Sequence, residues 1–425
     1  MDINKTKICV VGLGYIGLPT ASLLATKGFK VLGVDIDKNT VDTINQGKIH
    51  IHEPDLDVLV KSAVNAGNLT ASLKPDKADI FILSVPTPFR EGHEPNLDYI
   101  KSAIESIAPY LKNGNLVLLE STSPIGMTEK LAKWIKDLRP DLNVPLWSKT
   151  NSVNSSDEDS EQLYLAHCPE RVLPGQILRE LIDNDRVVGG VNIPSTKKCY
   201  DFYKTFVRGQ VLKSDSRTAE LVKLSENAYR DVNIAFANEL SIICDKNEIN
   251  PWEMIKLANC HPRVNILNPG PGVGGHCIAV DPWFIVHSAP KESRLIRVAR
   301  EVNDHKPTYV INKIKKQASK LKKPVIACLG LSFKANVDDL RESPALQIVE
   351  SMASENIGKL LLVEPFIKEL PKSLNNLKDV ELADMMPALQ QADIIALLVD
   401  HSIFRDINNS ILNERIVIDT RGMWQ

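Results

Sequence analysis

Close cysteine pairs are missing from this sequence. Its seven cysteines, an odd number, are scattered at positions 9, 168, 199, 244, 260, 277 and 328, and no two have CxxC spacing. This pattern excludes a disulfide framework and a zinc knuckle, and it is typical of proteins in a reducing compartment. We expect no metal site.

Long apolar runs and a surplus of charge are missing as well. No segment approaches the roughly 18 apolar residues that span a bilayer, and three glycines interrupt the apolar run at 8–18, so it does not resemble a secretory signal. The 51 Lys and Arg residues nearly balance 53 Asp and Glu residues, which is not the charge pattern of a nucleic-acid or membrane-surface protein. We therefore expect a cytoplasmic protein with no nucleic-acid partner and no membrane insertion.

What is present is an ordinary globular composition. Of the 425 residues, 43% are hydrophobic and 24% charged, with 21 glycines and 25 prolines. These values exclude collagen-like, disordered and coiled-coil proteins. The length predicts two or three domains, which we place at 1–205, 206–318 and 319–425.

Short β-type runs alternate with helical patterns at both ends of the chain. Predicted strands in the first series are 7–11, 30–35, 79–85 and 116–120, with a helix at 18–27. A second series has strands at 325–330, 359–363, 393–399 and 416–419, with a helix at 343–353. The segments KVLGVDID at 30–37 and KLLLVEPF at 359–366 resemble each other. This alternation predicts an α/β protein with two Rossmann-like, doubly wound parallel sheets.

A long helix is predicted between the two series. Residues 217–246 contain no proline or glycine, and their apolar residues recur at near-helical spacing. At 1.5 Å per residue such a helix is about 45 Å long. It could connect the two sheets or form the core of a dimer. The polar stretch 148–162 is predicted to be a surface loop.

The first strand leads into a dinucleotide-binding pattern. Gly12, Gly14 and Gly17 form a GxGxxG motif that opens the first helix. Gly12 permits the tight turn, Gly14 lets the backbone approach a pyrophosphate, and Gly17 allows close packing of helix and strand. Asp35 ends the next strand, where a carboxylate binds a ribose diol and repels a 2′-phosphate. The motif therefore predicts NAD as the cofactor.

Two threonines follow later strands of the same predicted sheet. Thr87 lies in VPTP at 85–88 and Thr122 in STSP at 121–124. Ligands of such sheets bind beyond the carboxyl ends of the strands, so both side chains are candidates for cofactor or substrate contacts. The alternative is that each simply forms a turn before a proline.

A polar stripe runs along the predicted long helix. It consists of Glu220, Lys223, Asn227 and Arg230, at spacings of three, four and three. On a buried helix these groups would need partners, which a substrate could supply. A solvent-facing stripe with a pair between Glu220 and Lys223 is the alternative.

A glycine-rich loop leads to a candidate nucleophile. Residues 268–277 contain four glycines and two prolines and end at Cys277, with Asp281 four residues on. A thiol becomes a good nucleophile when a cation or a helix N-terminus lowers its pKa. The alternative is an ordinary small buried cysteine. A thiol beside NAD suits the oxidation of an aldehyde to an acid, so the two features together suggest a four-electron oxidation that consumes two NAD.

Seven ordered motifs resemble one known family over nearly the whole chain. They are GLGYIGLP (12–19), VPTP (85–88), STSP (121–124), CPER (168–171), ELVKLSEN (220–227), PGVGGHCIAVDP (271–282) and GLSFKANVDDLRESP (330–344). The family is that of the UDP-glucose/GDP-mannose dehydrogenases, which are nucleotide-sugar 6-dehydrogenases. Residues 168–175, 261–286 and 300–307 look most like the bacterial UDP-N-acetyl-D-mannosamine dehydrogenases, which make UDP-N-acetylmannosaminuronate for surface polysaccharides.

The resemblance implies roles for matching positions. Cys277 would be the nucleophile, and Lys223 would stabilise alkoxide and oxyanion forms. Asp281, with Thr122 and a water, would handle protons, and Glu170 would be the base in thioester hydrolysis. Cofactor contacts would come from Gly12, Gly14, Tyr15, Ile16, Gly17, Asp35, Thr87, Thr122 and Arg341. Substrate contacts would come from Arg171, Val172, Lys223, Asn227, Arg230, His261, Arg263, Gly274 and Lys334.

The resemblance also implies an assembly and one departure. Residues 319–425 would bind the UDP-sugar, and residues 206–318 would carry the Cys277 loop and the dimer contact. Arg263 would reach the neighbouring subunit's site, which implies a homodimer. Many members have arginine five residues after the ribose-binding acid, where this chain has Thr40, so adenosine contacts are expected to be weaker or replaced by Lys38.

The sequence thus predicts the NAD-dependent oxidation of UDP-N-acetyl-D-mannosamine at C6 to its uronate. Alternatives are the same chemistry on UDP-N-acetylglucosamine or UDP-glucose, a two-electron β-hydroxyacid-type dehydrogenase, and a cofactor-sensing module without turnover. The β-hydroxyacid-type dehydrogenases share the spacing of Lys223 and Asn227, but the Cys277 loop argues against this alternative. NAD binding without NADH formation on any UDP-sugar would favour the third.

Overall fold

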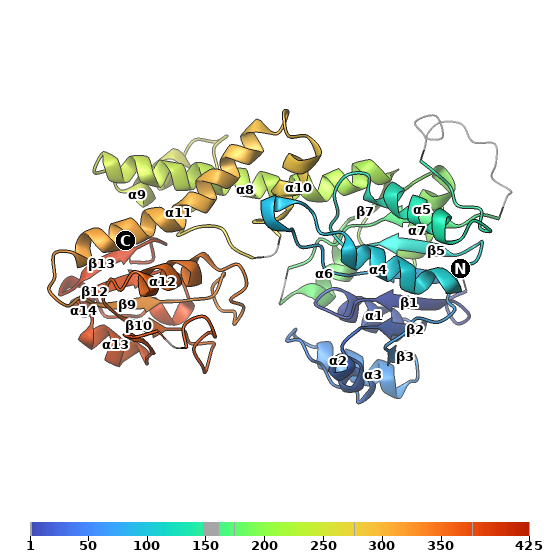
Figure 1. Ribbon diagram of the computed structural model, residues 1–425, viewed down its shortest axis with the longest axis horizontal. Coiled ribbons are helices and arrows are strands. Elements are labelled where there is room, and N and C mark those ends of the chain that lie inside the picture. Colours follow the sequence, from blue (N-terminus) through green and yellow to red (C-terminus); the bar gives the residue numbers. More distant parts are fainter. Residues whose placement is uncertain (1, 148–160, 174, 276, 376, 425) are drawn as a thin grey trace. The chain divides into compact units, whose positions relative to one another are not determined.

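The computed structural model describes residues 2–147, 161–173, 175–275, 277–375 and 377–424 (Figure 1). The chain forms two compact units, Met1–Ser225 and Glu226–Gln425. Their boundary falls within one continuous helix, α8 (Ser216–Lys246). The loop predicted at 148–162 lies outside the described residues except for its last two.

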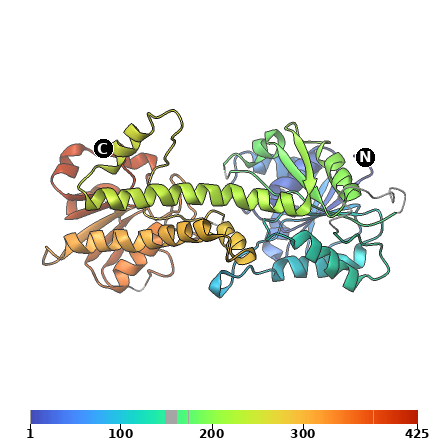
Figure 2. The ribbon, with the colours of Figure 1, turned by 90° about the horizontal axis from the view of Figure 1, so that it is seen from above.

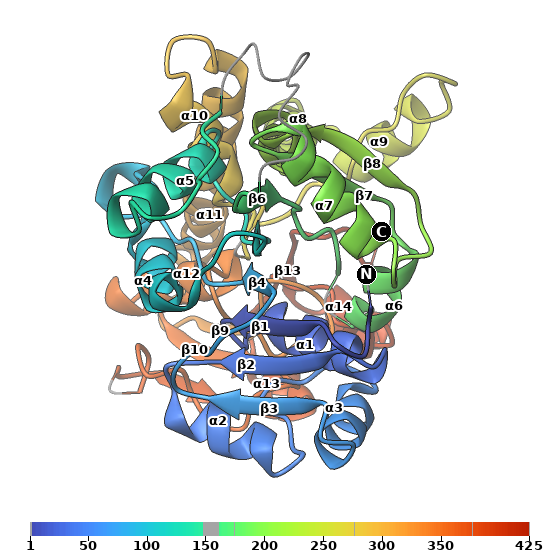
Figure 3. The same cartoon turned by 90° about the vertical axis from the view of Figure 1, so that its right-hand side faces the viewer.

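The first unit contains an eight-stranded sheet in the order β3-β2-β1-β4-β5-β6-β7-β8. Figure 3 shows β3, β2, β1 and β4 lying in this order. All neighbouring strands are parallel except β6 and β7. The strands are β1 (Lys7–Val11), β2 (Lys30–Val34), β3 (Leu69–Ser72), β4 (Ile80–Leu83), β5 (Leu116–Leu119), β6 (Tyr164–His167), β7 (Arg186–Gly190) and β8 (Val211–Asp215).

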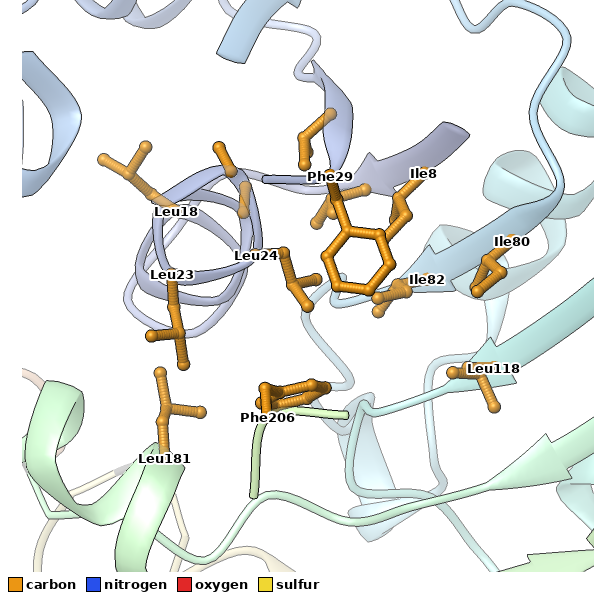
Figure 4. Close-up of a cluster of buried hydrophobic side chains, with 14 of the residues drawn as sticks. Ile8, Leu18, Leu23, Leu24, Phe29, Ile80, Ile82, Leu118, Leu181 and Phe206 are labelled. Carbon is orange, nitrogen blue, oxygen red and sulfur yellow. The ribbon is translucent and has the colours of Figure 1, made fainter. Parts of the chain in front are cut away.

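Helices cover both faces of this sheet. One buried apolar cluster includes residues of α1, α2, α3, α6 and α7, and a second includes residues of α4 and α5. Figure 4 shows the first cluster, in which Leu24 of α1 lies near Phe29 and Ile82. The helices are α1 (Gly17–Thr26), α2 (Lys38–Asn45), α3 (Leu56–Asn65), α4 (Asp98–Ile107), α5 (Met127–Leu138), α6 (Ile177–Asp183) and α7 (Ile193–Tyr203), with 3-10 turns η1 (Glu91–His93) and η2 (Ala108–Tyr110).

The second unit contains a smaller sheet of five parallel strands in the order β11-β10-β9-β12-β13. Its strands are β9 (Val325–Leu329), β10 (Lys359–Val363), β11 (Val380–Leu382), β12 (Ile394–Leu397) and β13 (Ile416–Asp419). One face buries residues of α11 and α12, and the other buries residues of α13 and α14. The prediction of two doubly wound sheets and a long helix is thus confirmed, with one antiparallel pair as the exception.

Helical segments complete the second unit. They are α9 (Pro251–Ala258), α10 (Asp281–Ser288), α11 (Arg294–Ala318), α12 (Pro344–Ser354), α13 (Met385–Gln391) and α14 (Asn409–Asn413), with the 3-10 turn η3 (Ser402–Phe404). Figure 2 shows α11 alongside the second-unit part of α8, and buried hydrogen bonds join the two helices. Among the described residues, no helix is both long enough and apolar enough to cross a bilayer.

Candidate active site

The turn after β1 has the backbone geometry that the GxGxxG motif predicts. Gly12 has φ +91°, and a Cβ there would lie 2.6 Å from Ser84 O. A Cβ on Gly17 would lie 1.8 Å from Gly12 O, whereas a Cβ on Gly14 would meet no atom of the described parts of the chain within 4 Å. Gly12 and Gly17 are therefore required by the fold. The space beside Gly14 is open, as close approach of a pyrophosphate would require.

Asp35 is tied to this turn. It follows β2, and its Oδ2 accepts a hydrogen bond from the Leu13 N–H at 2.9 Å. Its Oδ1 accepts from the Asp37 N–H at 3.0 Å. The carboxylate is thus held beside the glycine turn, where a dinucleotide ribose lies in this fold. Thr40 is buried and donates to Asp37 Oδ2 at 3.0 Å, so it helps cap α2.

Loops after β4 and β5 are joined at the same edge of the sheet. Thr87 Oγ1 donates to Thr122 O at 2.6 Å, and Ser121 Oγ donates to Val85 O at 2.7 Å. Because β1, β4 and β5 are neighbours, the glycine turn and both threonines lie beyond the carboxyl ends of adjacent strands. The structure thus brings these predicted cofactor residues to the switch point of the sheet.

Glu170 lies in the segment after β6 and is held by a buried ion pair. Arg186 Nη1 donates to Glu170 Oε2 at 2.7 Å, with side-chain exposures of 1% and 8%. The Arg171 N–H donates to Glu170 Oε1 at 2.7 Å. The Arg171 guanidinium donates to Asp185 O, and Val172 packs against the core. Sequence reasoning missed Arg186, because an arginine that begins an apolar strand carries no local signal of a partner.

A second buried carboxyl group lies in the same cluster, and it too was not predicted. Glu120 follows β5 and is 3% exposed. Tyr203 Oη donates to Glu120 Oε1 at 2.7 Å, and Ser84 Oγ donates to Oε2 at 3.0 Å. Burial, together with the nearby charge of Glu170, raises the pKa of Glu120 to about 7. Ser84 also packs against Gly12, so the hydrogen bonds of Glu120 help to hold the glycine turn in place.

The raised pKa of Glu120 predicts a pH-dependent stability. In the unfolded chain its carboxyl ionises near 4.5, so folding stability is lost as pH rises from about 4.5 to about 7. Glu120→Gln cannot ionise. Its free energy of unfolding relative to wild type should therefore rise by up to about 3 kcal/mol between pH 5 and pH 8. Thermal unfolding of both proteins at the two pH values measures this change.

The control is Glu239→Gln, which alters an exposed carboxyl group on α8. Because this side chain is exposed, the substitution should not reproduce the gain of Glu120→Gln. A difference between Glu120→Gln and wild type that does not vary with pH would contradict the effect of burial.

The polar stripe on α8 does not act as one surface. Glu220 is fully buried and accepts hydrogen bonds at the start of α5, from the Gly126 N–H at 2.6 Å and from Thr128 N–H and Oγ1 at 2.7 and 2.6 Å. Burial raises its pKa to about 7. Lys223 is half-buried and Arg230 exposed. Glu220 therefore holds the first part of α8 against the start of α5 and does not form a solvent-facing pair with Lys223.

Two other predicted residues meet in the second unit. Asn227 Nδ2 donates to Asp281 Oδ2 at 2.5 Å, and the two residues are 7% and 3% exposed. Cys277 is exposed, and its carbonyl accepts from the N–H groups of Val280 and Asp281 at the start of α10. The Asn227 amide thus fixes the first turn of α10, which directly follows the Cys277 loop.

Packing within the second unit accounts for the glycines of this loop. A Cβ on Gly274 would lie 2.3 Å from Glu342 O, and one on Gly275 would lie 3.0 Å from the Phe333 ring. Gly272 has φ +155° and faces Pro344. The glycines therefore let the loop lie against residues 333–344, a reason that the sequence pattern did not reveal. A small hollow of about 20 Å³ is lined by residues of both segments, Lys334 among them.

The remaining predicted residues of the second unit are exposed. Lys334 and Arg341 lie on the segment after β9, and Arg341 forms a two-bond ion pair with Asp339 at 2.8 and 2.6 Å. His261 and Arg263 lie in the turn after α9, where the Arg263 N–H donates to His261 Nδ1 at 3.3 Å. The Asp339 carboxylate also accepts from the Arg341 N–H, so it holds the guanidinium of Arg341 close to the Arg341 backbone.

Comparisons with known families cover most of the chain. Residues 6–207 match the NAD binding domain of the UDP-glucose/GDP-mannose dehydrogenase family. Residues 217–305 match its central domain, and residues 327–425 match its UDP binding domain.

Individual relatives are similar over their whole length. The chain is 57% identical over 424 residues to an NDP-N-acetyl-D-galactosaminuronic acid dehydrogenase of Ralstonia nicotianae, covering 100% of this chain and 97% of that protein. It is 53% identical to the UDP-N-acetyl-D-mannosamine dehydrogenase of Escherichia coli, covering 98% and 99%. The solved UDP-D-ManNAc dehydrogenase of Pyrococcus horikoshii has a TM-score of 0.84 at 36% identity, covering 99% and 96%.

Proposed function

The chain belongs to the UDP-glucose/GDP-mannose dehydrogenase family and is an NAD-dependent nucleotide-sugar dehydrogenase, and on that premise we propose that it oxidises UDP-N-acetyl-D-mannosamine at C6 to UDP-N-acetyl-D-mannosaminuronate. The oxidation removes four electrons through a thiohemiacetal and a thioester on Cys277. The relative named for N-acetyl-D-galactosaminuronic acid supports a second candidate, the corresponding galactosamine sugar.

One observation carries the proposal. The Asn227 amide of α8 donates to the Asp281 carboxylate. The Cys277 carbonyl accepts from the Asp281 N–H at the start of α10. Lys223 precedes Asn227 by one turn of α8. The exposed thiol and the buried carboxyl therefore belong to one arrangement of α8, the loop and α10 within the second unit, and such a thiol is what thiol-dependent aldehyde oxidation needs.

The residues of the first unit fit NAD. The open space at Gly14 and the carboxylate of Asp35 suit a pyrophosphate and a ribose diol. NAD, when bound, accepts one hydride in each of the two oxidations. Lys223 would hold the alcohol oxygen as its proton leaves, and Asp281 would accept that proton with the help of Thr122 and a water.

The second half of the reaction uses the thiol. The Cys277 thiol adds to the C6 aldehyde and gives a thiohemiacetal. Loss of the C6 hydride and of the hydroxyl proton then gives a thioester. Glu170 would take a proton from water, which attacks the thioester and releases the acid and the thiol. The Arg186 ion pair and the Arg171 N–H hold this carboxylate in place. Each cycle therefore yields one acid and two NADH.

Parallel assays test both the chemistry and the sugar. The enzyme is incubated with NAD and, separately, the UDP-linked N-acetylated mannosamine, glucosamine and galactosamine sugars and UDP-glucose. We expect about two NADH per acid, with the highest kcat/KM on the mannosamine sugar. A steady yield of one NADH per sugar would overturn the four-electron reaction. A higher kcat/KM on the galactosamine sugar would establish the second candidate.

A homodimer in a reducing compartment, the cytoplasm, is part of the proposal. Cys277 must remain a thiol to act, which a reducing compartment ensures. Tyr229, Phe236 and Ile243 recur at seven-residue spacing on α8 and are 70%, 55% and 48% exposed. Large apolar residues at this spacing suit contact with a second helix.

Phe236→Asp should therefore convert the dimer to a monomer, since a carboxylate would be buried in the contact. Light scattering after size exclusion measures the mass. Asn233→Asp, on the same helix one turn earlier, is the control and should stay dimeric. A dimeric Phe236→Asp protein would place the contact elsewhere.

A further inference from the structure

Buried polar side chains join α8 and α11 within the second unit, and the proposed reaction does not use them. Asp231 and Asn238 of α8 and Arg300 of α11 are fully buried, and Asn303 of α11 is 1% exposed. We call these four residues the helix relay. Burying such groups is costly unless each is hydrogen-bonded. A helix pair built only for stability would place apolar residues here, so the relay calls for another explanation.

The hydrogen bonds of the relay have a fixed direction. The Asp231 carboxylate can only accept when ionised, and it accepts from Arg300 Nη1 at 2.5 Å and from Asn303 Nδ2 at 2.8 Å. The amide of Asn303 must therefore present its oxygen to Asn238, whose Nδ2 donates to it at 2.8 Å. The Asn238 oxygen is then left as an acceptor on its other side.

The side-chain oxygen of Asn238 bonds to the Cys277 loop. Asn238 Oδ1 accepts from the Gly270 N–H at 2.9 Å, a buried bond at the start of the glycine segment. At the other end, Arg300 Nη1 also approaches Ile278 O at 3.4 Å, one residue after Cys277. The loop is thus attached at both ends to groups that Asp231 orients, while its middle lies against Phe333 and Pro344.

We propose that the helix relay is a positioning device for the Cys277 sulfur. The residues act through the backbone at Gly270 and Ile278, and none is assigned to touch the substrate. This inference rests on the proposed role of Cys277 and names the groups that keep its thiol aimed at C6. A loop released at Gly270 should leave the first oxidation, which needs no thiol, nearly unchanged, and should slow the capture of the aldehyde.

Asn238→Ala tests the relay, because it removes the acceptor of the Gly270 N–H. The matched control is Ser241→Ala. Ser241 is a buried residue one turn further along α8. In the described part of the chain its side chain donates to Asn238 O within α8 and accepts from Lys306 of α11, so it does not bond to the Cys277 loop. The NAD-dependent reaction is run with and without semicarbazide, which traps released aldehyde.

We expect Asn238→Ala to lower acid formation 10- to 100-fold, with trapped aldehyde accumulating and the KM for the UDP-sugar changing less than threefold. Ser241→Ala should release no more aldehyde than wild type, even at an equal loss of thermal stability. Equal losses of both oxidations in the two variants, or an unchanged acid yield in Asn238→Ala, would overturn the relay.

Two further measurements keep the test decisive. If Asn238→Ala does not fold, Asn238→Ser leaves a smaller gap, and the same aldehyde readout applies. Cys277→Ala is run in parallel. If Cys277→Ala releases aldehyde and the Asn238 variants do not, the relay is wrong and the proposed reaction stands. If Cys277→Ala still forms acid, the proposed reaction itself is wrong.

Discussion

Cys277→Ala is expected to lower the rate of acid formation by about three orders of magnitude or more, since loss of a covalent nucleophile has effects of this size. The first oxidation needs a hydride acceptor and a base but no thiol, so it should continue with at most one NADH per sugar. NADH absorbance and mass spectrometry of the sugar acid and of the semicarbazide adduct measure the two steps.

The chain provides a matched control for this substitution. Cys260 is also exposed and also lies in the second unit, and Cys260→Ala should keep two NADH per acid. Sustained acid production by Cys277→Ala would refute covalent catalysis at this residue. Equal losses in both variants would indicate an effect on folding, which thermal unfolding would reveal.

Gly17→Ala is expected to destroy the dinucleotide turn. The added Cβ would lie 1.8 Å from Gly12 O, a backbone atom that cannot move without displacing the start of α1. We expect a loss of stability of about 4 kcal/mol or more, in the range of severe core substitutions, together with the loss of NAD binding. Thermal unfolding and calorimetric titration with NAD measure the two effects.

Gly14→Ala separates cofactor binding from folding. Its Cβ would meet no atom of the residues that the structure describes within 4 Å, so the protein should unfold at the wild-type temperature. NAD should nevertheless bind about 10- to 100-fold more weakly, a change of about 1.4 to 2.8 kcal/mol, because the methyl group enters the space of the pyrophosphate. Unchanged NAD affinity in this variant would place the pyrophosphate elsewhere.

The fold could be predicted largely from local patterns. The strands predicted at 7–11, 359–363 and 416–419 have the observed bounds, and the helix predicted at 217–246 begins one residue earlier, at Ser216. Buried parallel strands are short apolar runs, and a long helix without glycine or proline is equally distinct. The helix α11 was not predicted, because Pro307 interrupts its pattern. The antiparallel pairing of β6 with β7 has no local signal.

The candidate site was predictable only where a motif fixes the backbone. Gly12, Gly17 and Asp35 follow from the geometry of one turn and the strand beside it. Roles for Glu170 and Arg263 came from family resemblance alone and remain predictions. Glu120, Arg186 and Tyr203 were missed, because they come from separate segments and meet only when the sheet and α7 pack together.

Spacing along the chain was enough to indicate the two nucleotide-binding sheets, the helix between them and the NAD turn, because each depends on residues within one or two elements. The partners of individual side chains depend on folding. Glu220 faces α5 instead of Lys223, and Asn238 reaches Gly270 from 32 residues away. A polar group that is buried loses its hydrogen bonds to water and must bond to another protein group. Its partner is therefore set by the segments that lie beside it in the packed core.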